Sequence, residues 1–168
     1  MPAWADVLDG NFVAAVEPYR QMFEMDPSNP MARLFYAWVL ILNRRKRDAN
    51  MLAETMPTDM RDTVPGRITL FLVLALEAKG CEAQAVLTPE IEIAAGATDV
   101  FPRLLAQGFA LARMAEPALH WLAIAVDRGF INYPFLSRHD PFFQSVRSDT
   151  RFMQLLDVVH DRWRRFEA

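Results

Sequence analysis

Two features of the sequence predict an all-α fold, and a third indicates that the chain builds a core. Hydrophobic residues make up 52% of the 168-residue chain and charged residues 23%, so there is enough apolar surface to build a core. Glycine is scarce, with 6 residues, and most of the 11 prolines lie between apolar runs, which is typical of helices joined by short turns. Apolar side chains also recur at helical spacing, as Ala15, Tyr19 and Met22 do. The length suits one domain.

The turn residues divide this domain into a series of expected helices. A short segment at 2–8 is followed by a helix at 12–25, which Pro27 and Pro30 end. Further helices are expected at about 31–43, 46–56, 62–79, 82–95, 99–112, 115–128 and 149–166. Pro18 removes a hydrogen bond inside its helix and is expected to kink it, and Pro89 interrupts the helix at 82–95.

The clearest internal pattern lies at residues 10–30. Gly-Asn-Phe forms a turn at 10–12, the small Ala15 and the large Tyr19 share a buried face, and Asp-Pro-Ser-Asn-Pro ends the helix. The small residue returns at intervals of 34, 34 and 35 residues, as Ala49, Ala83 and Ala118. This pattern resembles the second half of a tetratricopeptide repeat, whose period is 34 residues.

The segment from Ala118 onward is the second recognisable block. It runs through Gly129 and Asp140-Pro141 to Leu155-Leu156, and it is similar to the segment that closes tetratricopeptide arrays in bacterial regulatory proteins. Its last helix carries an apolar stripe formed by Phe152, Leu155, Leu156, Val159, Trp163 and Phe166. Such a helix caps an array, because an end repeat has no neighbour to cover its apolar face.

The resemblance implies a right-handed superhelix of antiparallel helix pairs with a C-terminal capping helix. The whole chain, 1–168, is then a single repeat domain. Its pairs lie near 1–30, 31–61, 62–98 and 99–130, and its cap lies at 131–168. The pair near 62–98 matches the repeat only by position.

The resemblance also predicts a binding surface. In tetratricopeptide arrays the first helix of each pair lines a concave groove, and the matching positions include Leu34, Trp38, Ile41, Leu72, Arg103 and Gln107. This mostly apolar lining suits an amphipathic helix or an extended apolar peptide, with Trp38 as the anchor. The alternative is that these residues pack against the C-terminal segment, which would leave the groove filled.

No residue pattern indicates catalysis, a cofactor or a metal. The three histidines, His120, His139 and His160, lack the spacing that places two ligands on one helix face. Cys81 has no partner and is expected to be a small, at least partly buried residue. No phosphate-binding loop or nucleophile elbow occurs. The basic run 44–47 lies at an expected turn, where a solvated loop is the usual outcome.

Charge and hydropathy bear on the kinds of partner and on the location of the chain. The net charge of −3 gives no electrostatic reason to expect nucleic acid. The longest apolar run, Ile68–Leu76, is too short to cross a bilayer, and the first residues have no signal-peptide pattern, so a cytoplasmic location is expected.

The resemblance therefore implies a protein–protein interaction module, and no residue pattern indicates an enzyme. The module would bind a peptide or protein partner in the concave groove, as a regulatory part of a larger signalling or transcription-regulating protein. The alternative is a helical scaffold that self-associates as a homodimer through its apolar helix faces.

Overall fold

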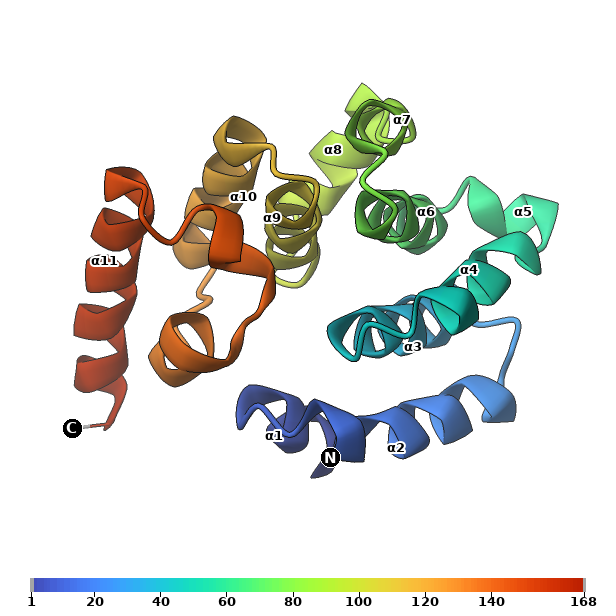
Figure 1. Ribbon diagram of the computed structural model, residues 1–168, viewed down its shortest axis with the longest axis horizontal. Coiled ribbons are helices and arrows are strands. Elements are labelled where there is room, and N and C mark those ends of the chain that lie inside the picture. Colours follow the sequence, from blue (N-terminus) through green and yellow to red (C-terminus); the bar gives the residue numbers. More distant parts are fainter. Residues whose placement is uncertain (1, 168) are drawn as a thin grey trace.

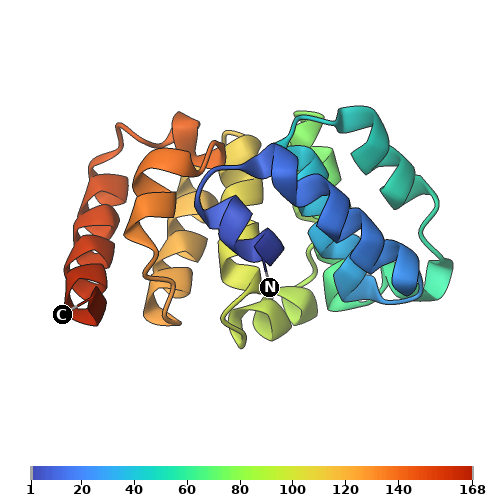
Figure 2. The same cartoon turned by 90° about the horizontal axis from the view of Figure 1, so that it is seen from below.

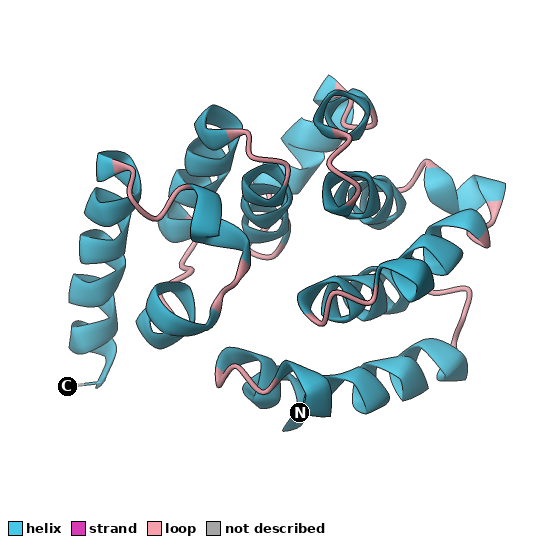
Figure 3. Ribbon diagram, viewed as in Figure 1, coloured by secondary structure: helices cyan, strands magenta, loops and turns pink. Residues whose placement is uncertain are grey.

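The computed structural model describes residues 2–167, and within that range every regular element is a helix (Figure 3). The longer helices are α1 (Pro2–Leu8), α2 (Phe12–Met25), α3 (Pro30–Leu42), α4 (Lys46–Glu54), α6 (Val64–Leu76), α8 (Pro89–Gly96), α9 (Phe101–Leu111), α10 (Ala115–Asp127) and α11 (Thr150–Glu167). Four short elements complete the chain: α5 (Thr58–Arg61), α7 (Gly80–Ala85), the π-helical turn η1 (Phe135–His139) and the 3-10 turn η2 (Phe142–Ser145). The all-α prediction is confirmed.

Three helices form the inner row of a curved stack. In Figure 1 the elements follow one another along an arc, with α3, α6 and α9 on its inner side. Helix α6 packs against both α3 and α9. A side chain at Gly108 on α9 would place its Cβ 2.1 Å from the Phe71 ring on α6. Because glycine has no side chain, these two inner helices can approach closely at Gly108.

Local sequence explains where the inner helices begin. The Asn29 side chain accepts hydrogen bonds from the backbone N–H groups of Met31 and Ala32, and Pro30 opens α3 with a backbone angle that suits a helix. Thr63 caps α6 in the same way by accepting from the Gly66 N–H. Helices α3 and α6 thus start at a side-chain cap, and each has a proline in its first two positions.

The outer helices pack through the repeating small residues. Ala15 on α2, Ala49 on α4, Ala83 on α7 and Ala118 on α10 are all fully buried. The residues four positions further on, Tyr19, Ala53, Leu87 and Leu122, are buried as well. Buried Arg33 ties α3 to α4 by donating a 2.7 Å hydrogen bond to the Leu52 carbonyl. The spacing of the alanines is therefore matched by their packing.

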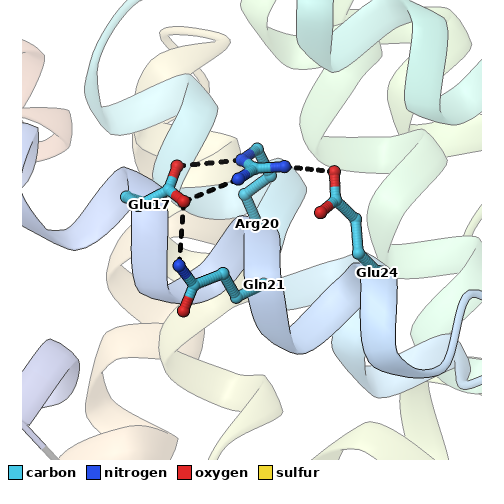
Figure 4. A network of polar contacts seen from close by, with 4 residues as sticks. All are labelled: Glu17, Arg20, Gln21 and Glu24. Carbon is cyan, nitrogen blue, oxygen red and sulfur yellow. Dashed lines mark hydrogen bonds and ion pairs between the residues drawn. The ribbon is translucent and has the colours of Figure 1, made fainter.

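Helix α2 keeps a charged outer face. Arg20 donates to Glu17 and to Glu24 one turn further on, and Gln21 donates to Glu17 at 2.9 Å (Figure 4). The hydrogen bonds from Arg20 and Gln21 lower the pKa of the exposed Glu17 carboxyl to about 2. Helix α2 is continuous from Phe12 to Met25, with Pro18 inside it.

The structure departs from the sequence expectations in three places. The interruption expected at Pro89 is present and divides the helix at 82–95 into α7 and α8, but the short α5 appears where no helix was expected. Cys81 is exposed, because it lies near the start of α7 on the side away from the buried Ala83, so the expectation of burial is wrong. In α11, Phe152 and Val159 are buried, but Phe166 is 75% exposed, so the apolar stripe extends beyond the body of the fold.

Candidate functional site

The predicted groove residues lie together on the inner row. Helix α3 contributes Leu34, Trp38 and Ile41, α6 contributes Leu72, and α9 contributes Arg103 and Gln107. Each of the six is at most 3% exposed. The inner side of the arc is therefore covered, in part by the C-terminal segment, which the sequence left as an alternative, and in part by α1. Trp38 has no accessible surface while that cover is in place.

The first cover is the segment 130–147, which connects α10 to α11. Phe135, Leu136 and Phe143 are fully buried, and η2 packs against α9. The Ser145 hydroxyl donates a 2.7 Å hydrogen bond to the Ala110 carbonyl of α9. Arg147 donates to the carbonyls of Ser137 and Asp140, both at 2.8 Å. These hydrogen bonds within the segment stabilise its conformation. This cover is an integral part of the core.

A chain of buried hydrogen bonds links this segment to the inner helices. The Trp38 Nε1–H donates to Gln107 Oε1 at 2.9 Å, and Gln107 Nε2 donates to Asp140 Oδ2 at 2.6 Å. The other carboxylate oxygen, Oδ1, accepts from the Phe142 N–H at 3.0 Å. Because Trp38 has only a donor, each later bond in the chain has a fixed direction.

Burial dominates the electrostatics of Asp140. It raises the pKa of this carboxyl to about 6, against the opposing effects of the Gln107 and Phe142 hydrogen bonds and of the Arg103 and Arg147 charges. Desolvation acts in this direction on any buried acid, since it disfavours the charged form.

Arg103 lies among aromatic rings at the centre of the concave face. Its guanidinium carbon is 4.8 Å from the ring centroids of Trp4 and Trp38 and 5.6 Å from that of Phe130. Such contacts stabilise a cation through the ring quadrupole. Its Nη1 atom is buried and has no hydrogen-bond partner. Burial lowers the pKa of Arg103 to about 10, although Asp140 and Tyr19 act in the opposite direction.

The second cover is α1. Its Trp4 ring lies 5.8 Å from that of Trp38, and Val7 is fully buried. Figures 1 and 2 show α1 across the open side of the arc, between α2 and the segment after α10. At the turn between α1 and α2, a Cβ on Gly10 would lie 2.5 Å from His139 Nδ1 of η1. The two covers therefore meet at this turn.

Several of these residues have no clear signal in the sequence. Trp4 lies in a short segment with no repeat partner, and Asp140-Pro141 is typical of a helix start. The one hint at Asp140 is its position between the apolar pairs Phe135-Leu136 and Phe142-Phe143, which favours burial.

The outer side of the stack carries an open groove between α10 and α11 with a volume of about 420 Å³. Its floor is apolar, with Leu119, Ala123, Leu155 and Val158, and its rim holds Glu116, His120, Arg151 and Gln154. His139 lies in η1, and His160 stacks on Tyr133 with ring centroids 4.2 Å apart. The three histidines thus lie on three different elements. Across residues 2–167 no group of three or more His, Cys, Asp or Glu side chains has a metal-binding arrangement.

No protein-family model, curated protein or solved structure matches this chain. Among the helices of the described residues, none has both the length and the apolar character needed to cross a lipid bilayer.

Proposed function

We propose that this chain is a non-catalytic protein–protein interaction module with a tetratricopeptide-like, superhelical arrangement of helix pairs. Its concave face would bind a helical segment of a partner protein, as part of a larger signalling or transcription-regulating protein. The observation that supports this most is the position of α1, a seven-residue helix that rests on the inner row and places Trp4 against Trp38 and Arg103. A helix laid in a groove with one aromatic anchor is a common mode of peptide recognition.

Two further features support the proposal. The resemblance to tetratricopeptide repeats rests on the alanine spacing, and each of those alanines is buried between helices. The inner row also offers apolar surface together with a cation and an amide, in Arg103 and Gln107, which is the mixture that gives a peptide groove both affinity and orientation.

Selection from a displayed library of helical peptides, with the full chain immobilised, tests this function. We expect the enriched peptides to contain a large aromatic residue and to slow amide hydrogen exchange in α3 and α9. A selection without enrichment, or protection confined to the outer groove between α10 and α11, would contradict the proposal.

A homodimeric scaffold is the second candidate function, and the exposed apolar side chains of α11 favour it. Met153, Val158 and Phe166 are all exposed, and Val158 lies beside the open groove against α10. Light scattering at high micromolar concentration distinguishes the two functions. A dimer that Val158→Asp converts to a monomer supports the scaffold, and a strict monomer excludes it.

A further inference from the structure

We infer that the partner of the concave face is an amphipathic helix with a tryptophan anchor and an acidic side chain beside it, and that it binds by displacing α1. This inference rests on the proposed function and names the partner of the same site. Helix α1 is then a built-in competitor that occupies the site until the partner replaces it.

Of the two covers, α1 is the one that can leave. The segment 130–147 is fixed to α9 and to itself by side-chain hydrogen bonds from Ser145 and Arg147. Helix α1 has seven residues, too few for a helix that is stable in isolation. Among the helices, α1 is adjacent mainly to α2, to which the turn at residues 9–11 joins it, and it reaches the inner row through side chains such as Trp4. Its departure therefore leaves the helix packing of the inner row in place.

The pattern of α1 defines what a replacement must carry. Trp4 contacts the inner row, Val7 is fully buried and Leu8 is half-buried, while Ala5 is exposed. This is the i, i+3, i+4 spacing by which an amphipathic helix presents its anchors to a groove. A partner with an aromatic and two aliphatic residues at this spacing fits the same contacts.

Arg103 explains how a partner can outcompete α1. The buried Nη1 atom has no hydrogen-bond partner while α1 is in place, and an unpaired buried donor is unfavourable. A carboxylate on the incoming helix, next to its tryptophan, would pair with this atom in a charge-assisted hydrogen bond. Since the ring of Trp4 itself brings no acceptor to Arg103, the acidic residue gives the partner an advantage over α1.

Gly10 provides a way to loosen α1 without changing any residue of the inner row. It has a φ of +80°, and a Cβ there would meet His139 at 2.5 Å. Alanine at this position is strained both by its backbone and by the contact. Gly129 is a matched control, because it has a φ of +102° but its Cβ would meet nothing within 4 Å.

The test uses the full chain and a fluorescent, helix-stapled peptide with the sequence of residues 2–9. We expect Trp4→Ala and Gly10→Ala to bind this peptide at least about tenfold more tightly than the unchanged chain, whose own α1 competes at a high effective concentration. Gly129→Ala should bind like the unchanged chain. A peptide with alanine in place of its tryptophan should not bind, and one peptide from a glutamate scan of its exposed positions should bind about tenfold more tightly. That gain should be absent in Arg103→Met.

Amide hydrogen exchange of the unchanged chain keeps the test independent of how well the variants fold. We expect α1 to exchange at least about 100-fold faster than α3 and α9. Equal protection of α1 and α3, together with equal peptide binding by all variants, would overturn the inference. If library peptides still protect α3 and α9 in that case, the proposed function stands and only the role of α1 falls. If no peptide protects the inner row in any variant, the proposed function falls as well.

Discussion

Asp140 shows how a single buried carboxylate orients the side chains around it. Trp38 offers only a donor, so Gln107 must turn its carbonyl oxygen toward Trp38 and its amino group toward Asp140. The second oxygen of Asp140 accepts from the Phe142 backbone. One acceptor pair thus fixes the rotamer of Gln107 and the path of segment 130–147 at once.

The first prediction concerns the pH dependence that this carboxylate causes. Burial raises the pKa of Asp140 from its ordinary 3.8 to about 6. Between these values the folded chain holds a proton that the unfolded chain has released, so the folded state binds more protons and stability falls as pH rises from about 4 to about 6. We expect the unfolding free energy of Asp140→Asn, relative to that of the unchanged chain, to rise by up to about 3 kcal/mol across this window. Urea unfolding at each pH measures the difference.

Comparison of the two proteins isolates this effect from other acids. Glu17, whose pKa is lowered to about 2, shifts stability in the opposite direction, but it does so equally in both chains. A difference in unfolding free energy that stays constant from pH 4 to pH 7 would show that Asp140 is not the cause.

At the scale of the elements, helix starts and close helix approaches decide the shape of the inner row. Asn29 begins α3 with two side-chain hydrogen bonds to the backbone, whereas Asn11 precedes α2 without any. Gly108 lets α9 approach α6, whereas Gly96 at the end of α8 has room for a side chain. Each pair therefore supplies a test position and a control.

Asn29→Ala should destabilise the protein by about 1 kcal/mol, because two backbone N–H groups at the start of α3 lose their acceptor. Asn11→Ala should change the unfolding free energy by less than about 0.5 kcal/mol. Thermal and urea unfolding measure both. Equal losses would indicate that the cap contributes nothing specific to α3.

Gly108→Ala should destabilise the protein by about 1–3 kcal/mol, since its Cβ would lie 2.1 Å from the Phe71 ring. The gain in helix propensity from glycine to alanine is smaller than this clash. Phe71→Leu in the same chain should recover part of the loss. Gly96→Ala, whose nearest neighbour would be Trp121 at 3.7 Å, should be neutral or slightly stabilising.

At the scale of the whole molecule, local sequence patterns predict most of the helices, but they do not predict which segments cover the inner row. Helical spacing, prolines and caps are properties of neighbouring residues, and they predicted most of the helices. The six groove candidates came instead from the resemblance to tetratricopeptide repeats, and they lie on the inner row. The cover of that row depends on contacts between distant residues, such as Trp4 with Trp38 and Gln107 with Asp140. No local pattern encodes such pairs, so Trp4 and Asp140 could not be recognised as part of the site.

The same distant contacts predict how the molecule unfolds. In a simple repeat array each unit contacts only its neighbours, so damage to one end stays local. Here Phe143, fully buried and packed on Phe152 at 5.6 Å, belongs to a segment that is hydrogen-bonded through Gln107 to Trp38. The inner row and the closing segment should therefore unfold together.

Phe143→Ala tests this coupling, with Phe166→Ala as its control. We expect Phe143→Ala to cost about 3–5 kcal/mol and to reduce the protection of amides in α3 and α11 by the same factor in hydrogen exchange. Phe166→Ala should change neither, because that side chain is 75% exposed. Loss of protection in α11 alone would mean that the closing segment opens separately. In that case the concave face would be uncovered from its C-terminal side, and α1 would not be the only segment that competes for it.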